Sequence, residues 1–260
     1  MLGHTVPSSS TPAPRPTRVQ LLVTCLVDRL YPDTGMAVVT VLERLGLEVQ
    51  CAAAQTCCGQ PAFNAGFTEE ARTLARHTID TLSKNADPIV VPSGSCGDMV
   101  IHQYETLFKD EPVYAERARA VAGRTHEFTQ FLVNVLGVAD VQAVSGEKIA
   151  YHACCHGLRG LGVKDEPVAL LRRVEGAALC PLAESDVCCG FGGLFAVKMA
   201  EISSAMLARK LECIHESGAE TVAVTDVSCL MHMAGGLHRR GSPVRVRHIA
   251  DVLAGSRPAE

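Results

Sequence analysis

Eight of the twelve cysteines in this sequence fall into two sets with the same arrangement. Each set has a single cysteine, then an adjacent pair followed by glycine, then another single cysteine. The first set is Cys25, Cys57, Cys58 and Cys96, and the second is Cys155, Cys188, Cys189 and Cys229. Several thiolates that converge on one point bind a thiophilic metal, either as an iron–sulfur cluster or as a tetrahedral zinc ion. The sequence therefore predicts two metal sites.

The distance between the two sets indicates an internal duplication. Counterparts in the two sets are separated by 130, 131 and 133 residues for the first cysteine, the pair and the last cysteine. The neighbouring residues agree as well, since Ser95–Cys96 is matched by Ser228–Cys229. Such a repeat predicts two similar structural units, each with its own site.

The Cys-Cys-Gly unit favours an iron–sulfur cluster over other uses of cysteine. Its glycine permits a positive φ and close approach of the backbone, and a helix that starts after it lowers thiol pKa values. Adjacent cysteines are poorly placed to form a disulfide with each other, because the bond geometry strains so short a ring. Zinc sites usually use C-x₂-C pairs, which this sequence lacks. We expect two [4Fe–4S] clusters, with zinc in one half as the alternative.

Other cysteines and histidines are not assigned by the repeat. Three cysteines have no counterpart in the other half, and we expect them to be buried and inert: Cys51, Cys180 and Cys213. Cys154 is ambiguous, because it stands beside Cys155 but would shift the repeat by one residue. Three histidines near the repeated cysteines could ligate metal, donate hydrogen bonds to cluster sulfur or be structural: His152, His156 and His232.

Strands and helices alternate in both halves. Short apolar runs predict strands at residues 19–24, 47–53 and 89–91, and at 148–152, 177–179 and 221–225. Helical spacing of apolar residues predicts helices at 35–45, with Gly46 as the C-cap, and at 68–82, with Thr68 as the N-cap. A further strand and helix are expected within 121–136 and within 244–253.

This order predicts an internally duplicated α/β fold with a parallel sheet and βαβ units in each half. Each repeated cysteine falls at or just beyond the C-terminal end of a strand, the edge at which open α/β sheets bind ligands. Cysteines far apart in the sequence should therefore converge. We expect a disordered tail at 1–17, rich in Pro, Ser and Thr, a first half at 18–140 and a second half at 146–256.

Composition excludes several function classes. The net charge of −4 provides no attraction to nucleic acid or anionic membranes. The one basic cluster, His238–His248, is expected to be a solvated helix end and turn, with a docking patch for an acidic partner or a carboxylate substrate as the alternative. No run approaches the roughly 18 apolar residues of a membrane span, and the N-terminus has no apolar signal segment. We expect a cytoplasmic protein whose thiols bind metal.

The residues around the cysteines resemble the CCG cysteine-rich domain that heterodisulfide reductases share with the iron–sulfur subunits of several dehydrogenases. They are most similar to the lactate-utilisation iron–sulfur subunit of three-part L-lactate oxidation systems, over nearly everything after residue 17. The stretches that carry the resemblance are Thr24–Asp28, Gln55–Asn64, Pro92–Cys96, Cys155–Arg159, Cys188–Gly193 and Asp226–Gly236. The resemblance implies an electron-transfer protein that works with two partner subunits, one of them ferredoxin-like, to oxidise L-lactate to pyruvate.

Two departures from related patterns refine that expectation. Heterodisulfide reductases end each motif in C-x₂-C, and this fifth cysteine is associated with a non-cubane cluster, whereas this chain has Met99 and His232 at those positions. Four thiolates in each half fit a [4Fe–4S] cluster. The chain also lacks the ferredoxin-type C-x₂-C-x₂-C-x₃-C-P run of the glycerol-3-phosphate and glycolate dehydrogenase subunits, so a ferredoxin-like relay must come from a partner.

The residues themselves indicate electron transfer and no complete active site. The sequence has neither a nicotinamide nor a flavin fingerprint, and no acid–base pair suited to lactate, so catalytic residues stay unassigned. We expect a component of an oxidoreductase complex rather than an enzyme that acts alone. The alternatives are an iron–sulfur subunit of another 2-hydroxy-acid or heterodisulfide-type oxidoreductase, and a zinc-binding scaffold.

Overall fold

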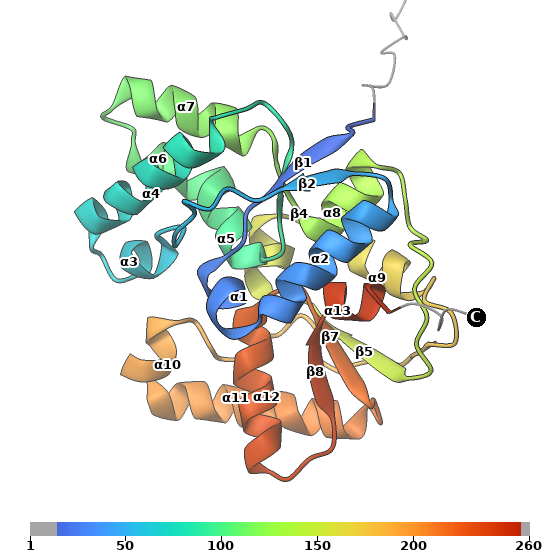
Figure 1. The fold of residues 1–260 in the computed structure, drawn as a ribbon. Helices are drawn as coiled ribbons and strands as arrows, with labels where there is room; N and C mark the ends of the chain where they lie inside the picture. The colour runs from blue at the N-terminus through green and yellow to red at the C-terminus, as the bar shows by residue number, and fades with distance from the viewer. Residues whose placement is uncertain (1–14, 256–260) are drawn as a thin grey trace, which may run out of the picture.

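The computed structural model describes residues 15–255, so most of the tail expected at residues 1–17 lies outside the described part. Each half of the chain builds one four-stranded sheet (Figure 1). The strands of the first half are β1 (Arg18–Leu21), β2 (Glu48–Gln50), β3 (Ile89–Val91) and β4 (Thr125–Glu127). Those of the second half are β5 (Lys148–His152), β6 (Ala178–Leu179), β7 (Thr221–Val224) and β8 (Arg245–His248).

The two sheets have the same topology. The strand order is β2-β1-β3-β4 in the first and β6-β5-β7-β8 in the second, and every pairing is parallel. Each strand of the second half thus takes the place of its counterpart in the first. The expected α/β fold, the parallel sheets and the duplication are confirmed.

Helices connect the strands and cover the sheets. In the first half they are α1 (Cys25–Leu30), α2 (Pro32–Arg44), α3 (Gln60–Asn64), α4 (Thr68–Leu82), α5 (Gly94–Asp98), α6 (Tyr104–Leu107), α7 (Pro112–Ala122) and α8 (Phe128–Gln130), with π-helical turns η1 (Met99–Gln103) and η2 (Phe131–Val135). In the second half they are η3 (His156–Gly160), α9 (Glu166–Leu171), α10 (Leu194–Lys198), α11 (Ala200–Glu216), α12 (Val227–Arg239) and α13 (Ile249–Leu253). Within residues 15–255, none of these helices combines the length and apolar character that a bilayer crossing requires.

Two of the central strands, β3 and β7, are buried on both faces. All three residues of β3 are buried, and so are all four of β7. Helices on both sides of a parallel sheet leave no polar face, so such strands appear in the sequence as continuous β-branched runs. Each run ends where the chain leaves the sheet. The next cysteine, Cys96 after β3 and Cys229 after β7, lies a few residues beyond that point.

Local boundaries differ from the expectations in several places. The C-cap of α2 is Leu45, and Gly46, expected as the C-cap, is the residue after it, with φ +82°. The strand expected at 47–53 spans only Glu48–Gln50. The strand expected at 19–24 ends at Leu21, because the chain turns into α1, which begins at Cys25. Helix α2 begins at Pro32, whose fixed φ suits the first helical position. The prediction that Thr68 is an N-cap is wrong: it is the first residue of α4, and the N-cap position is held by Phe67, which makes no side-chain capping bond.

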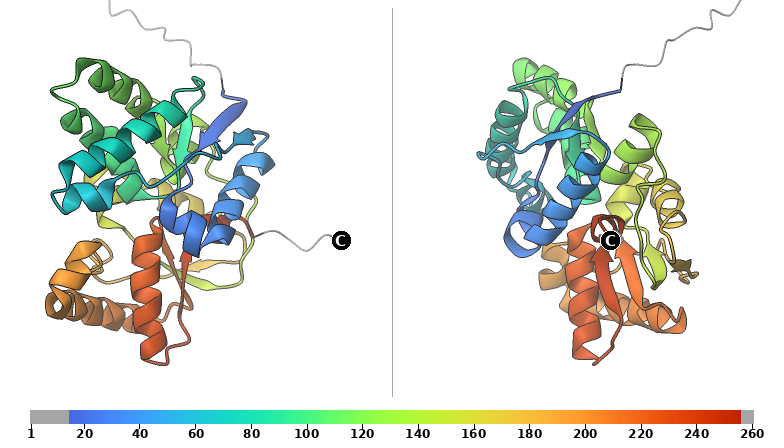
Figure 2. Two further views of the ribbon diagram at one scale, coloured as in Figure 1. Left: turned by 60° about the vertical axis from the view of Figure 1, so that its left-hand side comes forward. Right: turned by 45° about the vertical axis from the view of Figure 1, so that its right-hand side comes forward.

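The two halves pack against each other through α2 and α13, which lie side by side in Figures 1 and 2. One continuous core contains residues of both, among them Val38 and Leu42 from α2 and Ile249 from α13. Arg44, at the end of α2, donates hydrogen bonds to the carbonyl oxygens of Val141, Leu253 and Ala254, at 2.9, 3.0 and 2.8 Å. The halves therefore share one apolar core, and each also has a core of its own.

Candidate metal centre

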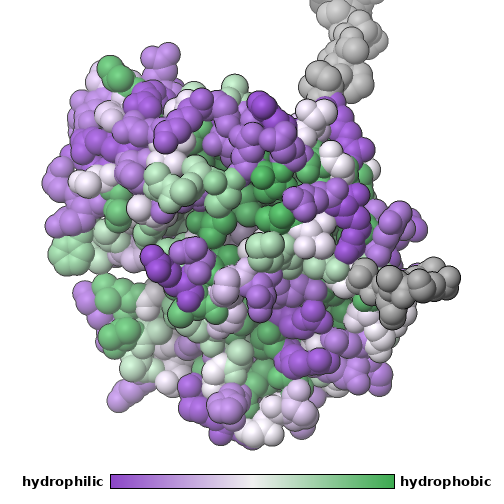
Figure 3. All heavy atoms as spheres, in the orientation of Figure 1, coloured by the Kyte–Doolittle hydropathy of each residue, from purple (hydrophilic) through white to green (hydrophobic). Residues whose placement is uncertain are grey.

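The eight repeated cysteines, together with Cys154, line a single cleft between the halves. Its volume is about 240 Å³, and the space-filling view is hollowed between α3 and α10, on the side where residues of both helices border the cleft (Figure 3). Polar side chains share the wall with the cysteines: Thr24, Gln60, Asn64, Ser93, Ser95, His156, Asp226 and Ser228. The duplication thus brings both sets of thiols to one place.

Strand ends and helix starts position each thiol. Cys25 is the first residue of α1, and Cys155 directly precedes η3. Cys96 and Cys229 lie in the first turns of α5 and α12. The two Cys-Cys-Gly units lie in the loops that follow β2 and β6 and lead to α3 and α10. The sequence-predicted residues come together at the expected sheet edge.

In the first half the four thiols form a contiguous chain of contacts. The sulfur atoms of Cys58 and Cys96 are 3.3 Å apart, and the amide of Gly59 donates to the sulfur of Cys57 at 3.5 Å. Hydrogen bonds from Cys25 and Cys58 lower the pKa of Cys57 to about 2. The same bond with Cys57 is the main cause of the raised pKa of Cys25. Cys57 is therefore the thiolate of this half. A metal that binds there would displace protons from the other thiols.

The second half repeats this geometry. The sulfur atoms of Cys189 and Cys229 are 3.5 Å apart, and the amide of Gly190 donates to the sulfur of Cys188 at 3.3 Å. Hydrogen bonds from Cys155 and Cys189 lower the pKa of Cys188 to about 2, while the contact with Cys188 raises the pKa of Cys189 to about 12. Each half thus places one thiolate at the first position of its cysteine pair, the form that binds metals.

The glycine of each unit is required by its backbone. Gly59 has φ +90° and Gly190 has φ +93°, a region that side chains rarely adopt. A Cβ at Gly190 would also lie 2.7 Å from the carbonyl oxygen of Ser203 in α11. Glycine therefore lets the loop pack onto the helix behind it. Its amide faces the sulfur of the first cysteine of the pair.

The three histidines near the cysteines have different environments. The imidazole of His156 pairs with the carboxylate of Asp98 across the two halves, with Nδ1 and Oδ2 2.8 Å apart. His232 packs edge-on against Phe191 and lies 3.5 Å from the hydroxyl of Ser203. Burial lowers the pKa of His152 to about 4, so this ring is neutral at physiological pH. His156 and His232 each have a partner away from the sulfur atoms.

The unrepeated cysteines lie outside the cleft, with one exception. Cys213 is buried as expected, Cys180 is half-buried, and the prediction that Cys51 is buried is wrong because it is exposed. Cys51 follows β2 at the sheet edge, where little packs over it. Cys154, which spacing left ambiguous, lines the cleft and contacts Cys229. Its position two residues after β5 was the available signal, since the other cleft cysteines also follow strands.

The donor set fits the cofactor of iron–sulfur proteins. Four free thiols in each half lie in mutual contact, around loops that let the backbone approach. Such a set suits metal or iron–sulfur binding. Small polar side chains flank it, among them Ser93, Ser95 and Ser228, and they leave room beside the sulfur atoms.

Comparison with known proteins identifies the family of this chain. Residues 19–101 and 149–234 match the family model described as CCG, cysteine-rich domain. "Lactate utilization protein A" of Exiguobacterium sp. is 49% identical over 236 residues, which cover 90% of this chain and 96% of that protein. The protein of the same name from Bacillus subtilis (strain 168) is 46% identical over 236 residues, covering 91% of this chain and 98% of that protein.

One solved structure has the same fold. A crystal structure of a hypothetical protein from Helicobacter pylori aligns with a TM-score of 0.61 at 10% sequence identity, covering 98% of this chain. The chain spans about half of that structure, 52% of its length. The similarity at this identity concerns the fold alone. From the two matched domains and the relatives that align along their whole length, the chain belongs to the lactate utilization protein A family of CCG cysteine-rich proteins.

Proposed function

We propose that the protein is an iron–sulfur electron-transfer subunit of a complex that oxidises L-lactate to pyruvate. The observation that carries the proposal is the convergence of two sets of four free thiols on one cleft. The relatives' name, "Lactate utilization protein A", supports the substrate. The units that each hold one cluster are the halves 18–140 and 146–256.

The proposed ligands are the repeated cysteines. In the first half they are Cys25, Cys57, Cys58 and Cys96, and in the second Cys155, Cys188, Cys189 and Cys229. A bound [4Fe–4S] cluster supplies reversible one-electron transfer. The protein's part is to supply thiolates, to hold them in the loops and first helical turns that follow the strands, and to bring the two sites into one cleft.

The proposal includes partner subunits. The sequence contains no motif for a hydride-accepting cofactor, so electrons must enter or leave through another protein. Apolar side chains are exposed on α10 and at the start of α11, beside the cleft: Leu194, Val197, Met199 and Ile202. Such a patch is typical of a protein contact. The proposal includes two partner subunits, one of them ferredoxin-like. It also places the protein in the cytoplasm, where thiols stay reduced.

Anaerobic metal analysis and a growth test examine the proposal separately. Reconstituted protein should contain about eight iron and eight sulfide per chain if both clusters are [4Fe–4S]. Deletion of the gene should abolish growth on L-lactate as sole carbon source and leave growth on pyruvate intact. Colourless protein with stoichiometric zinc in both halves would contradict the clusters. Unimpaired growth on L-lactate, in a strain without a second lactate dehydrogenase, would contradict the substrate.

A further inference from the structure

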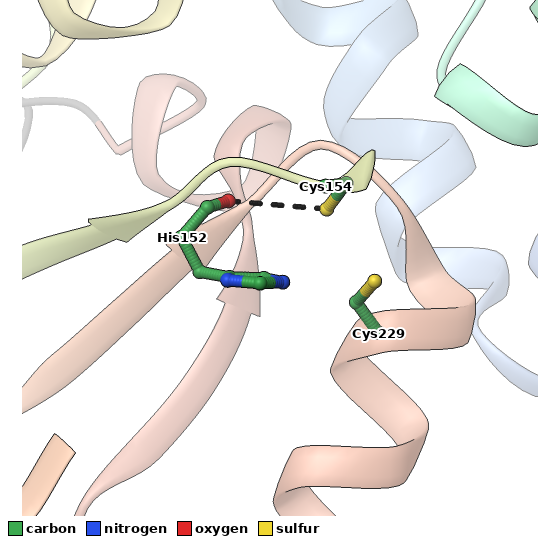
Figure 4. Close-up of side chains that lie close together, drawn as sticks. All are labelled: His152, Cys154 and Cys229. Carbon is green, nitrogen blue, oxygen red and sulfur yellow. Dashed lines mark hydrogen bonds between the residues drawn. The ribbon is translucent and has the colours of Figure 1, made fainter. Parts of the chain in front are cut away.

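The second half has a group of metal donors that the repeat does not explain. His152, Cys154 and Cys229 each place a ligand atom within 4.8 Å of the other two. His152 comes from the end of β5, Cys154 from the segment just beyond it, and Cys229 from the first turn of α12 (Figure 4). The ring and the two sulfur atoms face a common space in this view. Two thiols and an imidazole at this separation match the donors that thiophilic metals take in proteins.

We propose that His152 and Cys154 are additional metal ligands of the second half, so that the two halves hold chemically different centres. This inference rests on the proposed function, in which a cluster occupies that half. The second centre would have five thiolates and one imidazole within reach, against four thiolates in the first. The added donors would bind an iron of the cluster.

The environment of His152 is the strongest support. Its side chain is 0% exposed, and neither ring nitrogen makes a hydrogen bond of normal geometry with a described residue, although the carbonyl of Ser185 lies near. Buried polar groups almost always have partners, because burying one without a partner is unfavourable. A metal beside Cys154 and Cys229 would satisfy one nitrogen, and the Ser185 carbonyl could then orient the ring through the other.

Cys154 packs in an apolar core of the second half, where packing alone does not require a thiol. It is 2% exposed, and its sulfur lies 3.9 Å from the carbonyl oxygen of His152, a loose contact even for sulfur. Its sulfur also lies within 4.8 Å of the sulfur of Cys229. A small apolar residue would fill the same space without bringing a second sulfur toward Cys229.

The first half lacks both donors. With the offset of 130 residues that relates Cys25 to Cys155, His152 corresponds to Leu22 and Cys154 to Thr24. Leu22 is buried in the apolar core of its half, and a threonine hydroxyl is a poor ligand for a thiophilic metal. The asymmetry is therefore a property of this chain's second half and does not follow from the duplication.

Cobalt titration of the metal-free protein tests the ligands without any activity assay. Co²⁺ is added anaerobically, and thiolate-to-cobalt charge-transfer absorption and the visible d–d bands are followed. Cys154→Ser and His152→Gln should each weaken binding in the second half by at least about tenfold, since even indirect ligand contacts contribute that much. Cys213→Ser, which removes a buried thiol of the same half outside the cleft, should bind as wild type does.

A second measurement identifies the metal. Each variant is reconstituted with iron and sulfide, and the Mössbauer spectrum should lose or change one iron component in Cys154→Ser but not in Cys213→Ser. Cys154→Ala, which keeps an apolar shape, replaces the serine variant if the latter unfolds. The inference would be overturned if both Cys154 variants bound Co²⁺ and gave iron spectra as the wild type does. That result would not affect the proposal of two clusters. Zinc held in the second half in a Cys154-dependent way would support the ligands and contradict the proposed cluster there.

Discussion

The hydroxyl of Ser93 donates a hydrogen bond to the carboxylate of Asp226, with 2.9 Å between the two oxygen atoms. Each of these residues is the N-cap of the helix that carries the last cysteine of its set: Ser93 caps α5 and Asp226 caps α12. They are also counterparts in the repeat, 133 residues apart, as Cys96 and Cys229 are. The two capping side chains thus meet between the halves and link the helices that carry Cys96 and Cys229.

The first prediction concerns this contact. Asp226 accepts from Ser93 and from the amide of Ser95 with one oxygen, and from Ser228 with the other. Asp226→Asn replaces one accepting oxygen by a donor, so we expect a loss of about 1.5–3 kcal/mol in the free energy of unfolding. Urea denaturation measures it. Asp140→Asn, at an exposed carboxylate that caps its own loop, should change stability by less than about 1 kcal/mol. Equal effects in the two variants would contradict the role of the contact.

The second prediction concerns the close approach of the halves at Gly94. A Cβ at this position would lie 2.6 Å from the amide nitrogen and 2.8 Å from the Cα of Gly157, both backbone atoms of the other half. Gly94→Ala should therefore destabilise the protein by about 1–3 kcal/mol or more, since neither backbone can move independently. Gly146→Ala is the matched control, because nothing lies within 4 Å of its Cβ. Thermal unfolding of both variants measures the difference, and an unchanged midpoint in Gly94→Ala would contradict the close packing of the two backbones.

The third prediction assigns the cluster ligands. Cys58→Ser and Cys189→Ser each remove a thiol whose sulfur contacts a second cysteine of its set. Each variant should lose about half of the iron after anaerobic reconstitution, whereas Cys213→Ser should keep all of it. Iron and sulfide assays on folded protein give the answer. The assignment is wrong if Cys213→Ser empties a site while Cys189→Ser does not.

The fourth prediction concerns Glu127, the fully buried N-cap of α8. Burial raises the pKa of its carboxyl from 4.5 to about 7 in the folded protein. Between these values the unfolded state releases a proton that the folded state keeps, so this residue makes the protein less stable as the pH rises through that window. Below about pH 4.5 both states are protonated and the effect vanishes.

Glu127→Gln removes this dependence. The free energy of unfolding of the variant, relative to wild type, should increase by about 3 kcal/mol between pH 4 and pH 8, at 1.36 kcal/mol per pKa unit. Denaturation of the metal-free protein across this range measures the difference. Glu116→Gln, at an exposed position on α7, should show no such trend. A flat difference for Glu127→Gln would mean that its carboxyl titrates normally.

Some elements could be predicted because one local signal suffices for them. The β-branched run Ile89–Val91 is a strand at those bounds, because full burial on both faces leaves only apolar choices. The convergence of the repeated cysteines followed from the parallel sheet alone. The short helix α1 was not anticipated, since six residues are too few to be helical without the packing around them.

The spacing of the repeat did not predict that Cys154 lines the cleft. The repeat selects Cys155, yet the structure places both cysteines at the cleft, because the chain runs along the sheet edge after His152 before η3 begins. Which neighbouring side chains face the cleft depends on backbone direction past the strand end. A spacing of one or two residues cannot encode that direction, and tertiary packing decides it.

The hydrogen bonds of Arg44 have a consequence for synthesis of the chain on the ribosome. This arginine, in the first half, finds its carbonyl acceptors at Leu253 and Ala254, among the last described residues. Thr34 and Asp251 join the same two helices at 3.1 Å. The first half therefore emerges with the face of α2 that receives α13 uncovered, and that face stays partly exposed until Ile249–Leu253 has been synthesised. Any chain that terminates before Ile249 therefore leaves apolar side chains of α2, such as Val38 and Leu42, without the partners that α13 supplies.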